Sequence, residues 1–406
     1  MAHPSPDDLN AVIRHHSETL AAQLRAQRAG LFPPSAAKRM RPFDAEEAAG
    51  LLGVTEADLR ALHAAGRGPA PIMGQAGRRH YSALDLRALR DLLEARAPSL
   101  GTHRPGRRPG DHCQVIAVMN FKGGSGKTTT AAHLAQRLAL TGHRVLGIDL
   151  DPQASFTALH GVQPELDLPE GGTLYDAIRY DDPLPMRDVI RPTCIPDLDL
   201  VPGDLDLMDF EHDTPRALAR GDAGLFFFRV RDALAQVEAA YDAVVIDCPP
   251  QLGFLTMSAL SAATGVLVTI HPEMLDVMSM SQFLRMTADL MDVVAESGAD
   301  MTHDWIRYVL TRYEPADAPQ ARIADVLRGL YGDRVLRAAM LKSTAISDAG
   351  LTKQTLYEVE RGAFTRGTYD RAMTSLNAVN DEIAALIQRT WGREPRPAAA
   401  MAEAGA

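Results

Sequence analysis

The stretch "MNFKGGSGKTTTAAHLA" (residues 119–135) decides the fold of this chain. It continues an apolar run, "QVIAVMNF" at 114–121, and leads into a helical pattern, so a buried strand passes through a glycine-rich turn into a helix. The usual phosphate-binding loop reads G-x-x-x-x-G-K-[ST]. Gly126-Lys127-Thr128 fit the end of that pattern. However, Phe121 stands where the first glycine belongs, and a second lysine, Lys122, comes next.

The glycine-rich turn predicts a nucleotide site. Its glycines let backbone N–H groups approach phosphate oxygens without a Cβ in the way, and the helix N-terminus adds positive potential. We expect Lys127 to reach the β- and γ-phosphates and the Thr128 hydroxyl to bind Mg²⁺. The predicted nucleotide-binding set is the whole loop: Lys122, Gly123, Gly124, Ser125, Gly126, Lys127, Thr128 and Thr129.

Aspartates stand at the ends of two further strands. "GIDLDPQAS" (147–155) places Asp149 and Asp151 two residues apart at a strand end. "AVVIDCPPQLG" (243–253) is an apolar strand that ends in Asp247, where a carboxylate can hold Mg²⁺ through water. The Pro249-Pro250 pair marks a following loop that could sense a γ-phosphate. The predicted metal-site residues are Thr128, Asp149 and Asp247.

"KGGSGKT" resembles the deviant Walker A pattern, K-G-G-x-G-K-[ST], of a P-loop branch that includes the ParA and MinD ATPases and the nitrogenase iron protein. The resemblance implies ATP and Mg²⁺ as cofactors and a face-to-face dimer. In that dimer Lys122 crosses to the partner's phosphates, much as an arginine finger does. "GIDLDPQAS" resembles the Walker A′ motif of ParA proteins, which implies that Asp151 positions the attacking water and Asp149 lies near the magnesium shell. The implied catalytic residues are Lys122, Lys127 and Asp151, with weak basal ATPase activity.

The chain has 406 residues, enough for two or three domains. Apolar strands alternating with helices predict an α/β P-loop NTPase with a mostly parallel sheet between helices, preceded by a small, mainly α domain.

Net charge is −10 overall, yet residues 1–112 carry 16 Lys and Arg against 12 Asp and Glu. The predicted segments are a dimerisation helix within 1–42, a winged helix-turn-helix over 43–97, a linker over 98–112, the ATPase domain over 113–394 and a disordered tail over 395–406.

The segment 43–97 has two short helical patterns separated at Gly53, then a hairpin pattern, "APIMGQAGRRHYS", and a third helical pattern. It resembles the MerR-like winged helix-turn-helix, which puts Arg60 on the recognition helix and Arg78 and Arg79 on the wing, where they would contact phosphates. The alternative is a small helical domain that binds nothing. In the acidic body, candidates for non-specific DNA binding are basic residues that a solvated surface would explain equally well: Lys342, Lys353, Arg361, Arg366 and Arg371.

The resemblance to ParA proteins extends over almost the whole chain. The loop and "MLKSTAISDAGLTKQTLYEVERG" (340–362) resemble the RepA-type partition ATPases of alphaproteobacterial repABC plasmids. This implies an ATP-dependent homodimer that binds DNA non-specifically, represses its own operon through an operator, and is stimulated by a ParB/RepB-type centromere-binding protein. We expect a cytoplasmic protein, because its three cysteines are widely separated and it has no membrane-anchor pattern. The resemblance implies in addition that it associates with the nucleoid.

Three alternatives are weighed against this prediction. A transcriptional repressor with nucleotide-regulated DNA binding would need the front segment but not hydrolysis. A metal-cluster P-loop protein would need paired cysteines, which Cys113, Cys194 and Cys248 do not provide. A MinD-like membrane protein would need an amphipathic C-terminal anchor, and "RPAAAMAEAGA" lacks basic and bulky apolar residues at its end.

Overall fold

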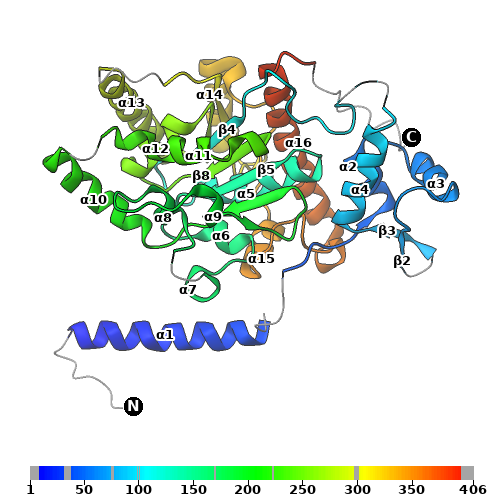
Figure 1. The fold of residues 1–406 in the computed structure, drawn as a ribbon, viewed down its shortest axis with the longest axis horizontal. Coiled ribbons are helices and arrows are strands. Elements are labelled where there is room, and N and C mark those ends of the chain that lie inside the picture. Colours follow the sequence, from blue (N-terminus) through cyan, green and yellow to red (C-terminus); the bar gives the residue numbers. More distant parts are fainter. Residues whose placement is uncertain are drawn as a thin grey trace. The chain divides into compact units, whose positions relative to one another are not determined.

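The computed structural model of this protein describes residues 9–31, 38–74, 77–97, 99, 101–168, 171–221, 224–296 and 301–394. The chain divides into two compact units, residues 1–39 and residues 40–406 (Figure 1). The first unit contains helix α1 (Leu9–Leu31), within the range 1–42 where the sequence predicts a helix. Leu9, Ile13 and Leu20 of α1 are exposed. None of the helices in the described ranges is long and apolar enough to cross a membrane. The predicted tail, 395–406, lies outside the described residues.

The second unit begins with the predicted helix-turn-helix and hairpin. Its elements are β1 (Phe43–Asp44), α2 (Ala45–Leu52), α3 (Glu56–Ala64), β2 (Ile72–Met73), β3 (Arg79–Tyr81) and α4 (Ala83–Glu94). A reciprocal capping box starts each helix, with Asp44, Thr55 and Ser82 as N-caps. Helix α2 ends at Gly53, whose φ of 66° is left-handed, as a glycine C-cap permits. Strand β1 completes an antiparallel three-stranded sheet of order β1-β3-β2 and was not predicted.

The central sheet has seven strands in the order β10-β9-β4-β8-β5-β7-β6. All neighbouring pairs are parallel except β6 and β7. The apolar strands predicted before the loop and at Asp149 and Asp247 are present as β4, β5 and β8, whereas β6 and β7 at one side of the sheet were not predicted. The strands are β4 (Gln114–Met119), β5 (Val145–Asp149), β6 (Arg191–Pro192), β7 (Leu198–Val201), β8 (Ala243–Asp247), β9 (Gly265–Ile270) and β10 (Trp305–Leu310).

Helices cover both faces of this sheet (Figure 1). The α-helices are α5 (Lys127–Leu140), α6 (Ser155–Leu159), α7 (Pro164–Asp167), α8 (Leu174–Ile178), α9 (Met186–Val189), α10 (Leu207–Arg220), α11 (Arg229–Ala235), α12 (Phe254–Ala262), α13 (Met274–Glu296), α14 (Ala318–Tyr331), α15 (Thr344–Leu351) and α16 (Arg366–Thr390). Short 3₁₀ helices lie at Phe226–Phe228, Glu238–Ala240, Gly332–Arg334 and Arg361–Ala363.

Strand β4 shows why the sheet is buried on both faces. Its side chains alternate, so Ile116 and Val118 enter one hydrophobic core and Val115, Ala117 and Met119 enter the other. The first core also contains residues of α5 and α16, and the second contains residues of α8 to α14. This two-sided burial explains the continuous apolar runs in the sequence.

The front elements share a core with the sheet domain. Phe43, Leu52 and Leu86 belong to the same buried cluster as residues of α5 and α16. Hydrogen bonds also join the two parts, because Arg90 of α4 is buried and its guanidinium donates to three backbone carbonyls. It donates to Leu51 O at 2.9 Å, to Leu140 O at 2.6 Å and to His103 O at 2.9 Å. Arg90 therefore caps the carboxyl ends of α2 and α5 together.

Described residues of the predicted linker are also fixed to the sheet domain. The Arg107 backbone N–H donates to Asp242 Oδ1 at 2.9 Å, and Gln388 Nε2 donates to Pro105 O at 2.8 Å. A Cβ on Gly106 would come within 2.5 Å of the Asp242 carboxylate, so the backbone approaches this side chain closely. Residues 98–112 thus connect two packed parts. The predicted segment boundaries at 42, 97 and 112 stay predictions.

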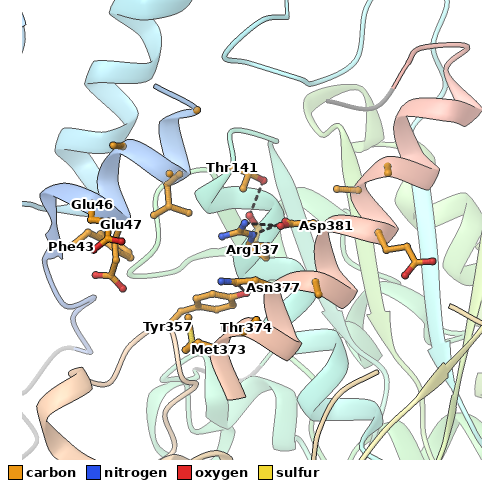
Figure 2. Close-up of a pocket in the computed structure, with 18 of the residues that line it drawn as sticks. Phe43, Glu46, Glu47, Arg137, Thr141, Tyr357, Met373, Thr374, Asn377 and Asp381 are labelled. Carbon is orange, nitrogen blue, oxygen red and sulfur yellow. Dashed lines mark hydrogen bonds and ion pairs between the residues drawn. The ribbon is translucent and has the colours of Figure 1, made fainter. Parts of the chain in front are cut away.

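A groove of about 2360 Å³ lies between the front elements and α16. Figure 2 shows Phe43, Glu46 and Glu47 on one wall and residues of α16, including Asp381, on the other. Arg137 of α5 binds Asp381 through two hydrogen bonds, of 2.8 and 2.9 Å. The glycine-rich loop does not line this groove. This groove is therefore separate from the predicted nucleotide site.

Replacing Arg90 by methionine should lower the free energy of unfolding by about 2–4 kcal/mol, because buried carbonyls of α2 and α5 would lose a charged donor. Urea denaturation of the full chain measures this. Arg87→Met is the matched control, since Arg87 lies on the same helix with its side chain 51% exposed and should change stability by less than about 1 kcal/mol. Equal losses for the two variants would contradict the capping role.

Candidate functional site

The glycine-rich loop starts at the carboxyl end of β4, in the middle of the sheet. The Asn120 side chain fixes its first turn, because Nδ2 donates to Thr269 O at 2.5 Å and Oδ1 accepts the Lys122 N–H at 3.0 Å. Gly124 and Gly126 have φ values of 78° and 86°, in the left-handed region that glycine reaches without strain. Gly126 is the N-cap of α5, so the unpaired N–H groups of the first turn of that helix begin at this loop.

Two neighbouring strand ends hold the loop from behind. Thr269, at the end of β9, donates its hydroxyl to Ser125 Oγ at 3.0 Å. Thr311, just after β10, donates to Ser125 O at 2.7 Å. A Cβ on Gly126 would lie 3.4 Å from the Thr311 side chain, at ordinary van der Waals distance, so glycine is favoured here by its positive φ and not by lack of space. The predicted nucleotide-binding residues thus form one braced loop.

Lys127 is buried at the start of α5, with 6% of the residue exposed. Its ammonium donates to Lys122 O at 3.2 Å. Burial lowers the pKa of Lys127, while the carboxylates of Asp247 and Asp151 nearby oppose that shift. The structure therefore brings together the predicted phosphate lysine and two of the predicted acidic residues.

The carboxylates of Asp149 and Asp247 differ in their partners. Asp149 is fully buried, and its Oδ2 accepts the Thr157 N–H at 2.7 Å and the Thr157 hydroxyl at 2.6 Å. Its Oδ1 accepts the Asp151 N–H at 3.2 Å. Burial raises the pKa of Asp149 to about 7, although these hydrogen bonds lower it. The magnesium role predicted for Asp149 stays a prediction, and both its oxygens already have donors.

Asp247 is the better candidate for a cation. It is fully buried, and within the described part of the chain neither of its carboxylate oxygens has a partner at full hydrogen-bond geometry, although the Thr128 hydroxyl lies close enough to lower its pKa. Burial, followed by the nearby charge of Asp149, raises the pKa of Asp247 well above its usual range. A buried carboxylate without donors is costly unless a positive charge compensates it. Thr128, half-buried in the first turn of α5, and Asp247 therefore fit Mg²⁺, a hard ion that prefers oxygen ligands.

Lys122 lies apart from this group. Its side chain is 41% exposed, and its ammonium forms an ion pair with Asp276 in the first turn of α13 of the same chain. The crossing of Lys122 to a second copy stays a prediction. Asp151 is buried, and its Oδ1 accepts the Gln153 N–H at 3.0 Å, so its position in the loop after β5 is fixed.

Residues that the sequence analysis missed follow the ends of β4 and β10 or lie in the first turn of α13. Asn120, Asp276, Thr311 and Arg312 all contact the loop or its lysine. Arg312 has a φ of 51°, which is unusual for a residue other than glycine, and its Nη1 donates to Gly124 O at 3.2 Å. Since the carboxyl ends of parallel strands share one edge of a sheet, the residues after β9 and β10 could have been included on that ground.

The predicted DNA-binding residues are dispersed. Arg60 is exposed on α3 and pairs with Glu56 at 3.3 Å. Arg78 is exposed and Arg79 half-buried at the hairpin. Among the candidate basic residues of the acidic body, Lys342 pairs with Glu314 at 2.6 Å and Arg361 pairs with Asp370 at 2.5 Å. Arg366 and Arg371 are exposed. The pairs with carboxylates reduce the net positive charge that Lys342 and Arg361 offer to a phosphate backbone. All of these DNA contacts stay predictions.

Asp247→Asn should make the nucleotide-free protein more stable at neutral pH. The unfolded chain releases this proton near the ordinary pKa of 3.8, but the folded chain keeps it to higher pH, so folding loses stability as pH rises above about 4. Asparagine removes that loss, and we expect the variant to gain about 1–3 kcal/mol at about pH 7 and little at about pH 4.

Urea denaturation at a series of pH values checks this, with Asp292→Asn, an exposed position on α13, as the control. A stability gain for Asp247→Asn that does not shrink toward acid pH would show that the carboxyl is not strained by its burial.

Comparisons with known proteins identify the family. Residues 113–297 match the sequence family described as "AAA domain". "Putative replication protein A" of Rhizobium rhizogenes is 53% identical over 388 residues, which cover 95% of this chain and 96% of that protein. "Chromosome partitioning protein ParA" of Caulobacter vibrioides is 32% identical over 238 residues, which cover 58% of this chain and 83% of that protein.

Two solved structures extend this likeness. "Partition Protein" superposes with a TM-score of 0.58 over 92% of this chain and 98% of that chain, and its 18% identity supports likeness of fold alone. Cobyrinic acid a,c-diamide synthase from Mycobacterium smegmatis, with bound ATP analog and magnesium, has a TM-score of 0.50 and 29% identity and covers 59% of this chain and 91% of that chain. From its sequence relatives and its fold together, the chain belongs to the ParA family of partition ATPases.

Proposed function

We propose that this protein is an ATP-dependent plasmid partition protein that hydrolyses ATP to ADP and phosphate. The observation that carries the proposal is the buried, unpartnered carboxylate of Asp247 beside Lys127, in a phosphate loop that has a second lysine. Such a site has both charges needed to hold a magnesium-bound triphosphate. The names of its relatives, a chromosome partitioning protein among them, support the partition role.

Each residue has a separate task in the proposed mechanism. Lys127 binds the β- and γ-phosphates, and Thr128 and Asp247 hold Mg²⁺, Asp247 through water. When bound, Mg²⁺ neutralises charge that develops on the phosphate oxygens. Asp151 orients the attacking water from its fixed loop, with Asp149 supporting that loop through the Asp151 N–H. Lys122 is supplied by one copy to the phosphates of the other, so hydrolysis depends on dimerisation.

The proposed partners follow from this dependence. With ATP the protein forms a homodimer and binds DNA non-specifically, which places it on the nucleoid in the cytoplasm. A ParB/RepB-type protein at a plasmid centromere stimulates hydrolysis and releases it from DNA. Plasmids then follow the receding DNA-bound population. Exposed Arg366 and Arg371 on α16 support a DNA contact on the ATPase domain, together with the predicted Lys342 once it leaves Glu314.

A second activity, repression of its own operon, is proposed for the front elements. Helices α2 and α3, with a hairpin that exposes Arg78, have the order expected of a winged helix-turn-helix. Arg60 on α3 would read the operator, and Arg78 and Arg79 would contact its backbone. The alternative function is mainly transcriptional repression with nucleotide-regulated DNA binding. Measurable ATP turnover with a plasmid-stability defect in a loop variant separates the two.

Lys127→Ala should abolish ATP-dependent self-association and reduce ATP turnover by at least about 100-fold, because the triphosphate would lose its buried ammonium. Turnover is measured by phosphate release, and segregation by retention of the parent plasmid over generations. Lys38→Ala, a lysine substitution in the first unit, is the control. Normal partition by the Lys127→Ala variant would refute the site assignment.

Replacing Arg78 and Arg79 together by alanine should weaken operator binding about ten-fold or more and lower its salt dependence by about two phosphate contacts. Fluorescence anisotropy on operator DNA at several salt concentrations measures this, with Arg67→Ala, exposed in the same part of the chain, as control. Hydrolysis without DNA should stay near normal. If instead hydrolysis is lost while operator affinity is unchanged, the roles of the two parts are reversed.

A further inference from the structure

Lys122 is held by its own chain. Phe121 stacks on Phe283 of α13, with ring centroids 6.3 Å apart and planes 14° apart. This contact seats the start of the loop against α13, whose first turn contains Asp276. The Asp276 side chain then reaches the Lys122 ammonium and forms an ion pair with it. The packing of one aromatic pair therefore places a carboxylate directly in front of the second lysine.

Asp276 has few other contacts that could explain its position. Only 6% of the residue is exposed, and besides Lys122 its carboxylate lies 3.6 Å from His271 Nδ1. Although it stands in the first turn of α13, its carboxylate forms no hydrogen bond with a backbone N–H of that turn among the residues that the structure describes. A helix-capping role would show such a bond. Asp276 is thus a buried carboxylate whose main compensating charge is Lys122, and removing that charge is unfavourable.

We propose that Asp276 is a positioning residue that keeps Lys122 in its own chain until a nucleotide-loaded second copy is present. This inference rests on the proposed function, in which Lys122 must act across a dimer. The ammonium of Lys122 can leave a buried carboxylate only for an anion that binds it more strongly. A triphosphate in the facing copy has more negative charge than one carboxylate. Asp276 therefore sets the threshold at which Lys122 transfers and hydrolysis begins.

Asp276→Asn should free Lys122 in the nucleotide-free protein. We expect its labelling by an amine-reactive reagent to become about ten-fold faster, as loss of a hydrogen bond between charged groups predicts. Peptide mass spectrometry reads the labelling, with Lys342 as internal reference. With ATP and Mg²⁺, half-maximal self-association should need several-fold less nucleotide, measured by sedimentation velocity, and turnover without a ParB-type partner should rise.

The control variants distinguish a role of Asp276 in positioning Lys122 from a role in supporting the fold alone. Asp289→Asn removes a charge from an exposed position on the same helix and should leave labelling and self-association unchanged. Asp276→Glu keeps the charge and should restore slow labelling. Lys122→Ala with Asp276→Asn should behave as Lys122→Ala alone, because Asp276 acts through that lysine. Asp276→Ser replaces the asparagine variant if the latter does not fold.

The proposal is overturned if Lys122 labels at the parent rate in Asp276→Asn. It is also overturned if the variant loses self-association and turnover as Lys122→Ala does, since Asp276 would then serve the assembled state. Failure of the proposed function gives a different result, in which the parent protein does not self-associate with ATP at all. The labelling comparison needs no nucleotide, so in that case it still shows whether Asp276 holds the Lys122 ammonium.

Discussion

The parallel register of β4, β5 and β8 is the constraint on which the site depends. Asp149 and Asp247 are direct neighbours across β5 and β8, so two carboxylates end side by side in a buried position. Strand β4 lies on the other side of β8 and delivers the loop with Lys127 to the same edge. The positive lysine offsets part of the cost of this acidic pair, and a bound cation would offset more. A shift of one residue in this register would turn Asp247 away from the site.

Much of this arrangement could be predicted from the sequence. The glycine-rich loop, the apolar strands and the aspartates after them are local patterns whose geometry follows from the backbone. The two short helices α2 and α3 were also predictable, because the N-caps Asp44 and Thr55 begin them and Gly53 ends the first. Strand β7 was missed although Leu198-Asp199-Leu200 alternates, since four residues between loops give too little periodicity.

Other features depend on contacts between distant segments, which no local pattern contains. Nothing near Lys122 in the sequence identifies Asp276, 154 residues away, as its partner. The same holds for His133 of α5, which accepts the Leu356 N–H at 3.2 Å and lies 2.7 Å from Thr129 O through its other nitrogen. Burial lowers the pKa of His133 to about 4, so this histidine is neutral and serves packing between α5 and the chain before α16. The sequence alone gives such a histidine no distinguishing mark.

Arg90 has a consequence for how this protein could be divided. The Arg90 guanidinium caps the carboxyl ends of both α2 and α5. Helix α5, which begins at the phosphate loop, therefore has its last carbonyl bound by a residue of the front elements. A fragment cut at residue 113 would leave Leu140 O without this donor and would remove Leu52 and Leu86 from the buried cluster that also contains residues of α5. A front segment moved onto a related protein would thus fit only if the helix that corresponds to α5 ends with a free carbonyl for the arginine. That protein would also need a glycine at the position of Gly142, which leaves room for the aliphatic part of the Arg90 side chain.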